Sequence, residues 1–450
     1  MNDFVAQLKS GRSLPLPDLD SARKALDLKA HKVLNPAIRR DKHVSEQIDG
    51  VTTTRIEPVA RIALPLQELI IGRAVAFLFG NPVAYLANPK DPQEQLVFKH
   101  LKHILLQAKT DSLNRRIARN VMSYGECAEL WYPVPLNRHS SRGENTTLFT
   151  LKCTLLSPAL GDTLYPYYNE VGDMVAFSRE YKRVGTPDTY YFETYTAHLH
   201  YLFKQVNGQY VPVEGYPKAN PIGKIPVIYA CQEGHETKGV DGLIERLEHL
   251  LSNFADTNDY HASPKIFVKG TIHGWSQKGE SGAVIEGDKE SSMEYVSWHN
   301  APESVSLEID TLLRLIYTLT QTPDISFESV RRVGGISGVA LKLLFMDAHL
   351  KVQYKREIFD EYLTRRINVL KAYIAQLHLP LKDACDSLEV QPEITPYSLN
   401  SEDEQLDYWL KACGGKPLIS HQEAIARAGI AQEPLEATRC GGDSPLRIYS

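Results

Sequence analysis

The chain has 450 residues, of which 43% are hydrophobic and 23% are charged. This composition supplies enough apolar surface for packed cores and excludes a disordered chain. At about 150 residues per domain, the length favours about three domains. The 50 Lys and Arg residues stand against 55 Asp and Glu residues, which gives a net charge of -5. That balance argues against a protein that grips duplex DNA over a broad basic face.

Cysteine usage fits a reducing compartment, and hydropathy argues against a membrane span. The six cysteines lie far apart and form no CxxC pair, which argues against a disulfide scaffold or zinc ribbon and fits a reducing compartment. The first residues show no secretion signal. The most apolar stretch, 62–87, is interrupted by Gln67, Glu68, Arg73 and two prolines, so core or interface helices are expected there.

The first part of the chain is predicted to be an arm followed by helices. Residues 1–55 mix basic, acidic and proline residues, so we expect an arm with short helices. Apolar residues then recur at helical spacing from Leu64 to Leu78, and Gly80–Pro82 ends that helix. Two more helices are predicted over 93–107 and 112–122.

The middle of the chain changes to a strand pattern. Strands are predicted over 128–132, 148–155, 174–181, 189–196 and 198–204, with turns at Asn169–Glu170 and Asn207–Gly208. The fold class expected from helices and strands in this order is α+β.

Two helices and a short insert follow. A stripe on the first helix consists of Leu243, Ile244, Leu247, Leu250, Leu251 and Phe254. The insert 265–299 is rich in Gly, with strands expected at 266–268 and 294–298. Asn300 and Glu303 form a capping box for the second helix, whose apolar residues are Leu307, Leu312, Leu315, Ile316 and Leu319. The pattern predicts two helices, which we call the legs, joined by a small insert that contains strands.

A glycine-rich segment then precedes a long helix. Residues 321–324 stop the previous helix, and Gly334, Gly335 and Gly338 predict a mobile loop. Ser337 can cap a helix that runs without Pro or Gly to about His378, a rod of about 60 Å. Two capping boxes in the tail predict helices over 402–413 and 421–429.

Motifs for catalysis or cofactors are absent from the sequence. It contains no GxxxxGK[ST], GxGxxG, HExxH or GxSxG pattern. His198 and His200 share a strand face, and His100 and His103 share a helix face, but neither pair has a further ligand at suitable spacing. We therefore expect no catalytic residues, no cofactor and no metal; an enzyme with a cryptic site remains an alternative.

The tail offers another alternative. The helices 402–413 and 421–429 have the outline of a helix-turn-helix, so a DNA-binding regulator that uses this C-terminal helical hairpin is conceivable. Its second helix carries one Arg and one Glu, and the first begins with three acidic residues. That face has too few positive charges to bind phosphate groups well, so a structural helical hairpin is favoured.

A series of motifs resembles one known family. Thr322-Pro323-Asp324-Ile325-Ser326 followed by Gly335-Ile336-Ser337-Gly338-Val339-Ala340-Leu341-Lys342 is similar to the tunnel-loop signature of portal proteins from tailed double-stranded-DNA bacteriophages with siphophage-type tails. Similar elements recur in family order at 66–82, 112–132, 156–181 and 223–228, so the resemblance covers most of 60–430. The arm, the short tail and the insert depart from the family pattern.

The resemblance implies a domain order. It predicts an N-terminal arm (1–55), an α/β wing (56–239, with the long helix 339–379), a two-helix stem (240–262 and 300–321) and a small α/β clip (263–299). A tunnel loop (322–338), a long kinked or continuous helix after it and a short helical crown (380–450) complete the expected portal fold.

It also implies partners and a location. A portal is a non-enzymatic ring of twelve copies at one capsid vertex, through which double-stranded DNA is packaged and later ejected. The expected partners are other copies of the chain, the DNA in the channel, the terminase large subunit, the major capsid and scaffolding proteins and the head–tail adaptor, with no membrane. The protein would be made in the host cytoplasm and reside in the virion.

Physical reasoning on charge agrees with a conduit. Many fixed Lys and Arg contacts to phosphate would anchor DNA, so a slightly acidic chain with few cations on a flexible loop suits passage better. The residues expected to line the channel are Arg331, Arg332, Gly334, Gly335, Ser337, Gly338 and Lys342. The alternative is that Arg331 and Arg332 pair with carboxylates of a neighbouring copy.

The leucine stripes carry a second expectation. A narrow two-helix leg cannot bury its stripe alone, whereas adjacent legs in a ring can. The stem residues expected to serve as core and subunit interface together are Leu243, Leu247, Leu250, Leu251, Leu312 and Ile316. The alternative is an ordinary helical hairpin of a monomer.

Overall fold

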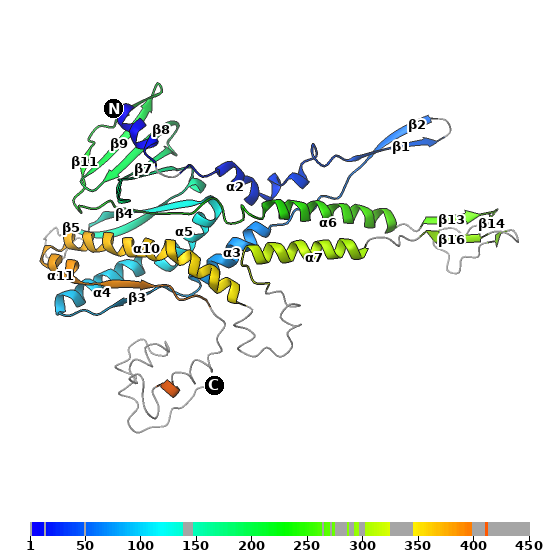
Figure 1. Ribbon diagram of the computed structural model, residues 1–450. Coiled ribbons are helices and arrows are strands. Elements are labelled where there is room, and N and C mark those ends of the chain that lie inside the picture. The colour runs from blue at the N-terminus through cyan, green and yellow to red at the C-terminus, as the bar shows by residue number, and fades with distance from the viewer. Residues whose placement is uncertain are drawn as a thin grey trace. The chain divides into compact units, whose positions relative to one another are not determined.

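The computed structural model describes residues 2–12, 15–48, 51–137, 147–262, 265–270, 272–274, 286–287, 292–296, 302–324, 345–397 and 410–412. The chain divides into two compact units, and the first contains 1–324 and 347–396. Nearly all described residues belong to this unit, whose elements are labelled in Figure 1. Most of the two predicted tail helices lies outside the described residues.

An antiparallel sheet forms the middle of the first unit. Its strands are β6 (Thr163–Tyr168), β7 (Met174–Arg183), β8 (Thr186–Thr196), β9 (Leu199–Val206) and β10 (Gln209–Pro212). They follow the order β10-β9-β8-β7-β6, and β11 (Lys218–Ala219) pairs with β9. The turn at Asn207–Gly208, with φ values of 50° and 79°, joins β9 to β10 as a tight hairpin. The three strands predicted for this region are confirmed.

A second sheet packs against the first. β4 (Glu126–Asn137) lies between β12 (Val227–Cys231) and β5 (Thr147–Leu156), and both pairings are antiparallel. Leu156 and Tyr229 from this sheet share a buried cluster with Leu164 and Phe177 from the larger one. The predicted strands 128–132 and 148–155 are confirmed as the inner parts of β4 and β5.

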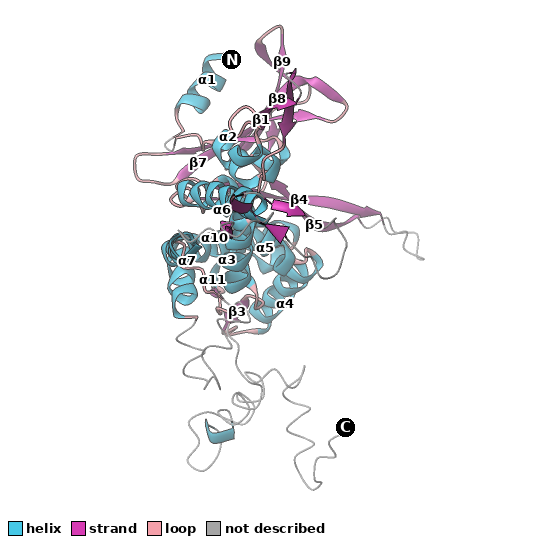
Figure 2. Ribbon diagram, turned by 90° about the vertical axis from the view of Figure 1, so that its right-hand side faces the viewer, coloured by secondary structure: helices cyan, strands magenta, loops and turns pink. Residues whose placement is uncertain are grey.

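Helices cover the smaller sheet. They are α3 (Leu66–Phe79), α4 (Pro92–Gln107), α5 (Thr110–Tyr124), α10 (Met346–Leu377), η4 (Leu379–Leu381) and α11 (Lys382–Ser387), with a short ladder between β3 (Ala84–Ala87) and β17 (Val390–Glu393). Figure 2 shows α3, α5 and α10 grouped beside one another. The three predicted helices before residue 125 are confirmed, and the fold is α+β.

The long helix is shorter than the sequence suggested. α10 has 32 residues, about 48 Å, and begins at Met346 after a turn at Phe345. The continuous rod expected from Ser337 is therefore interrupted before Met346. Residues 337–344 lie outside the described ranges.

The N-terminal residues are part of the packed structure. α1 (Asn2–Ser10) places Val5 and Leu8 in a cluster with Phe192 and Phe203 of the large sheet. The short helices α2 (Leu19–Leu26), η1 (Leu28–Ala30) and η2 (Lys32–Leu34) follow. The expected arm does contain short helices, but it also includes an unexpected ribbon of β1 (Lys42–Ile48) and β2 (Val51–Glu57).

A buried ion pair joins α10 to β4. Glu129 and Arg366 are both fully buried, and the guanidinium donates from Nε and Nη2 to the two carboxylate oxygens at 2.7 and 2.9 Å. Trp131 Nε1 also donates to Glu129, and Arg366 Nη1 donates to Asn114. A buried carboxylate needs this many partners because its desolvation is costly.

Removing the cation should therefore destabilise the fold strongly. We expect Arg366→Met to lower the free energy of unfolding by about 3–5 kcal/mol, because Glu129 would stay buried without its counter-ion. The neighbouring Arg365 forms a partly exposed pair with Glu361, and Arg365→Met should cost about 0.5 kcal/mol or less. Urea unfolding of both variants measures the difference; equal losses would contradict the role of Arg366.

A second carboxylate is buried within the large sheet. Glu193 on β8 is 6% exposed and accepts hydrogen bonds from Arg179, Tyr195 and His200 at 2.7–2.8 Å. Burial opposes its ionisation, but the hydrogen bond from His200 and the charge of Arg179 outweigh burial and lower the pKa of Glu193 to about 2.

This shift predicts an acid-dependent loss of stability. The folded pKa of Glu193 is depressed below the ordinary value of 4.5, so its contribution is present above pH 4.5 and is lost as the pH falls towards 2. The free-energy difference between the wild type and Glu193→Gln should shrink by about 3 kcal/mol over this range. Urea unfolding from pH 5.5 downward tests this, with Glu170→Gln at an exposed turn as control. A difference independent of pH would contradict it.

Candidate functional site: the α6–α7 pair and the roots of the loop

The two predicted legs exist and pack on each other. α6 (Asp241–Ala262) and α7 (Pro302–Leu319) lie side by side (Figure 1). Leu247, Leu250, Leu312 and Ile316 are buried in a cluster between them, with Leu243 and Leu251 packed against it. Leu66 and Ile70 of α3 complete the cluster. The six stem residues named from the sequence thus share one core inside the chain; a role for them between copies stays a prediction.

The opposite face of α6 binds the N-terminal segment. His31 Nδ1 lies 2.6 Å from Glu248 Oε1, and His31 Nε2 lies 3.2 Å from the carbonyl of Ala25. Both neighbours are acceptors, so both ring nitrogens carry protons. The hydrogen bond to Glu248 outweighs the effect of burial and raises the pKa of His31.

Further contacts extend this attachment along α6. Arg39 donates to Asp256 at 2.5 Å and to Asn253 at 2.7 Å. The backbone N–H groups of Ala60, Ile62 and Leu64 donate to Asp256, Ser252 and Glu248 respectively. The helix α6 is therefore held between the N-terminal segment on one face and α7 on the other.

The insert between the legs contains paired strands. β13 (Lys265–Lys269) pairs antiparallel with β16 (Ser292–Val296), and β14 (Ile272–Gly274) pairs with β15 (Glu286–Gly287). The strands predicted at 266–268 and 294–298 agree with β13 and, for 294–296, with β16. The remaining insert residues lie outside the described ranges.

The predicted tunnel loop (322–338) follows α7 in the sequence. We call the end of α7 the first root of the loop. Gln321 adopts φ 49°, the left-handed conformation that commonly ends a helix. Lys351 Nζ donates to the carbonyl of Thr320 at 2.8 Å, and Arg73 Nη1 donates to the carbonyl of Pro323 at 2.7 Å. Lys351 thus pairs the carbonyl group just past the helix end, and Arg73 holds the segment that follows it.

The second root is the first part of α10. It is fixed by a charge cluster between two lysines of α10 and the segment before α6. Glu236 accepts from Lys351 at 2.9 Å and from Lys355 at 2.6 Å, and Gln232 Oε1 accepts from Lys355 at 2.8 Å. Burial opposes ionisation of Glu236, but the two ammonium groups outweigh it and lower its pKa. Burial lowers the pKa of Lys351.

This cluster was not predicted from the sequence. Lys351 and Lys355 are one helical turn apart and share a face with Val352, Ala348 and Phe359, all buried. Two lysines on an apolar helix face are a signal for a buried acidic partner. The identity of that partner, Glu236, depends on the tertiary fold.

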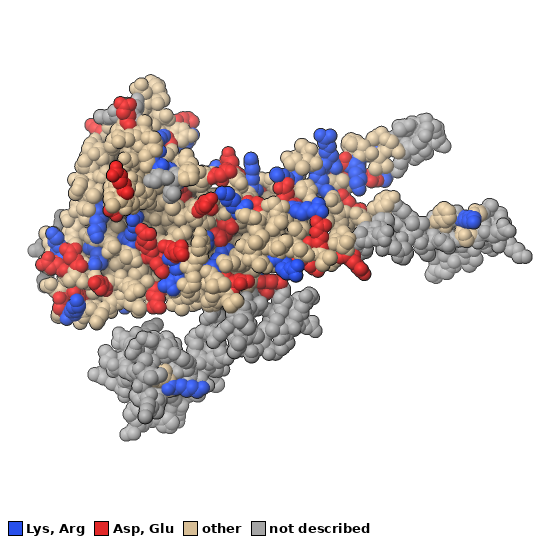
Figure 3. Space-filling view, in the orientation of Figure 1, with Lys and Arg blue, Asp and Glu red and all other residues tan. Residues whose placement is uncertain are grey.

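The residues predicted to line a channel cannot be placed. Arg331, Arg332, Gly334, Gly335, Ser337, Gly338 and Lys342 all lie outside the described residues. In the sequence, these residues lie between the end of α7 and the start of α10. Figure 3 shows acidic and basic side chains interspersed over one face of the described residues.

The histidine pairs considered from the sequence have other contacts. His200 binds Glu193 and stacks on Tyr195, and His100 stacks on His378. Within the described ranges, no group of three or more His, Cys, Asp or Glu side chains could hold a metal ion. No helix there is long and apolar enough to span a bilayer.

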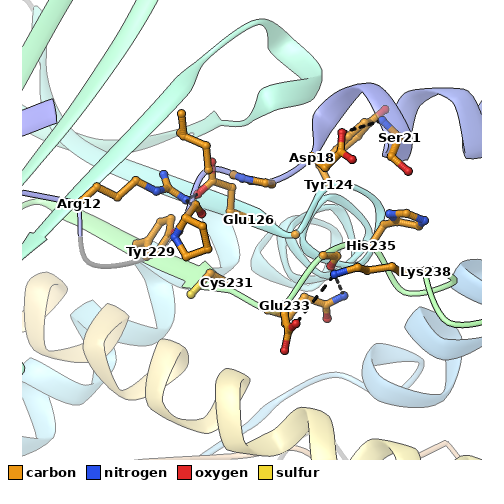
Figure 4. A pocket seen from close by; sticks show the side chains of 16 residues that line it. Arg12, Asp18, Ser21, Tyr124, Glu126, Tyr229, Cys231, Glu233, His235 and Lys238 are labelled. Atoms are coloured by element: carbon orange, nitrogen blue, oxygen red, sulfur yellow. Dashed lines mark hydrogen bonds and ion pairs between the residues drawn. The ribbon is translucent and has the colours of Figure 1, made fainter. Parts of the chain in front are cut away.

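A cavity of about 570 Å³ lies between the N-terminal segment, β4 and β12 (Figure 4). Four of its charged side chains form two pairs: Arg12 donates to Glu126, and Lys238 lies 3.9 Å from Glu233. The Tyr229 hydroxyl also donates to Glu126. These contacts tie the segments together, and we assign the cavity no ligand.

The described site is built from helix packing and ion pairs. A family model described as phage portal protein, SPP1 Gp6-like, matches residues 9–437. The chain therefore belongs to this family of phage portal proteins, as the sequence motifs indicated. Portal proteins are a structural, non-enzymatic family, and the chain is accordingly not an enzyme.

Three solved structures of phage-like particles are similar to the chain. The neck of an empty GTA particle computed with C6 symmetry has a TM-score of 0.42 at 9% identity, covering 81% of this chain and 88% of that one. The virion of a native gene transfer agent particle has 0.43 at 8%, covering 94% and 98%. The neck of a native GTA particle computed with C12 symmetry has 0.44 at 10%, covering 95% and 98%. None of the curated proteins matches the chain.

The cluster at the loop roots generates a prediction. Lys351→Met should cost about 1–3 kcal/mol of stability, because the Thr320 carbonyl loses its buried donor. It should also speed amide hydrogen exchange in 316–324. Arg356 lies on the same helix. Within the described residues, its ion pair is a partly exposed one with Asp360. The control Arg356→Met should leave exchange in 316–324 unchanged; equal exchange in both variants would contradict the anchoring.

Proposed function

We propose that copies of this chain form a closed ring at one vertex of a phage capsid, with an axial channel for packaging and ejecting double-stranded DNA. The observation that carries the proposal is membership of the portal family over residues 9–437. The net charge of -5 supports it, because a channel with few fixed cations releases phosphate easily. We propose twelve copies and residence in the virion after synthesis in the host cytoplasm.

The parts of the chain receive roles under this proposal. Residues 240–262 and 300–321 serve as the stem, 263–299 as the clip, and 56–239 with 339–379 as the wing. The clip is the docking site for the terminase large subunit and later for the head–tail adaptor. The major capsid and scaffolding proteins contact the outer parts. The pairing of α6 with α7 and the strands of the insert support the stem and the clip.

The loop 322–338 is proposed to contact DNA inside the channel. Arg331 and Arg332 would touch phosphates briefly, with Lys342 nearby, while the glycines let the loop move. The anchored ends of the segment support this role. A loop that follows moving DNA needs fixed attachment points, and Lys351 and Arg73 hold the first of them.

Imaging of the purified chain tests the ring directly. Negative-stain electron microscopy and mass photometry should show closed rings with a central hole. A stable monomer at high protein concentration would contradict the proposed function.

The two loop arginines give a more specific prediction. Replacing Arg331 and Arg332 with Ala should leave ring formation intact and reduce the DNA packaged or retained per particle, because transient phosphate contacts are lost. Ring yield is read by mass photometry, and DNA content by nuclease protection in a packaging extract. Loss of rings instead would show that these arginines tie neighbouring copies together.

A further inference from the structure

Three leucines of α7 lie outside the core of the α6–α7 pair. Leu307, Leu315 and Leu319 are 68%, 41% and 62% exposed, whereas Leu312 and Ile316 are buried. Leu315 and Leu319 are about one helical turn apart, and Leu307, eight positions before Leu315, lies about 80° from it around the helix axis, within one broad face of α7. We call these three residues the α7 ridge. Together these leucines offer apolar side chains that a second surface can cover.

The β1–β2 ribbon is a second surface, and apart from their mutual pairing neither of its strands makes extensive contact with another helix or strand of the described ranges. Its strands pair over their full length, Lys42–Ile48 with Val51–Glu57. Ile56 on the ribbon is 64% exposed, and Ile38 at its root is 54% exposed. A two-stranded ribbon alone is marginally stable in water, so this one requires a further surface.

The ribbon and the ridge lie on opposite sides of α6. Arg39 and Ile62, at the root of the ribbon, bind Asp256 and Ser252 of α6. Asp256 follows Leu247, a residue of the α6–α7 core, by nine positions, which is half a turn around the helix. Figure 1 shows the ribbon and α7 on the two sides of α6.

We propose that the β1–β2 ribbon of one copy packs on the α7 ridge of the next copy. The inference rests on the proposed ring. A closed ring of identical copies needs two different, complementary surfaces on each copy, one for each neighbour. The ribbon and the ridge are two such surfaces, and their position on opposite sides of α6 directs them towards different neighbours.

The chemistry of the two surfaces fits this contact. Ile38 and Ile56 offer apolar side chains to the leucine ridge. Arg40 and Lys42 are exposed at the root of the ribbon, and Glu303 and Asp310 are exposed on α7. Opposite charges around an apolar contact favour the correct partner and orientation.

The stem residues named from the sequence play a different part in this arrangement. Leu247, Leu250, Leu312 and Ile316 are already buried within one chain. They hold α6 and α7 together, and so they present the ridge at a fixed angle. The contact between copies is then made by side chains that are exposed in the single chain.

Two variants of the full-length chain test the proposal. The ridge variant carries Leu307→Glu and Leu315→Glu. The ribbon variant replaces 43–56 with two glycines, which join Lys42 to Glu57, partners in the strand register. Leu106→Glu and Leu160→Glu, at leucines that are 77% and 67% exposed elsewhere, are the matched controls. The point variant Ile56→Glu serves as a second ribbon variant, and circular dichroism verifies the fold of each.

A mixture of the two variants shows whether the ribbon of one copy contacts the ridge of another. Each variant alone should be monomeric at concentrations about tenfold or more above those at which the wild type and the controls form rings. An equal mixture should form heterodimers by mass photometry, because one intact ribbon still meets one intact ridge. No higher species should form.

Other outcomes overturn the inference and separate it from the proposed function. Rings formed by both variants as readily as by the wild type would show that copies meet through other surfaces, while the ring itself would stand. Variants that stay monomeric even when mixed would show that ribbon and ridge do not contact each other. A wild type that remains monomeric would overturn the proposed function.

Discussion

The structure depends on the need to pair carboxylates that the fold buries. Glu129 and Glu248 are 0% and 2% exposed, and Glu236 is nearly as inaccessible. A buried carboxylate without a partner would cost several kcal/mol. Each therefore recruits a cation from a distant part of the sequence: Arg366, His31 and the Lys351–Lys355 pair. These pairs fix where the long helices lie.

The helix α10 is the element on which most of these pairs converge. Arg366 attaches it to the small sheet, Lys355 to the segment before α6, and Lys351 to the end of α7. One rigid helix thereby links the sheets, the α6–α7 pair and both roots of the segment 325–344. Because its cations are paired at three separate places along its length, α10 acts as a common support for these elements.

The elements with strong local signals were predictable from the sequence. The apolar helix α3, the amphipathic helix α6 and strands such as β7 follow from the spacing of their apolar residues. The family followed from the order of short motifs. The β1–β2 ribbon was missed because Thr52, Thr53 and Thr54 give it no apolar alternation. The packing of α1 on the sheet and the partners of Arg366 and Lys351 were missed because they join residues far apart in sequence. The expected channel residues, Arg331 among them, fall where the structure describes nothing.

Native-state hydrogen exchange of the wild-type chain tests the central claim most directly. If buried pairs lock α10 to the rest of the frame, the amides of 351–370 should exchange only through global unfolding, at the same free energy as those of β4 at 127–131. Exchange of α10 at a clearly lower free energy than β4 would show that the helix opens independently. The buried ion pairs would then not lock α10 to the rest of the structure.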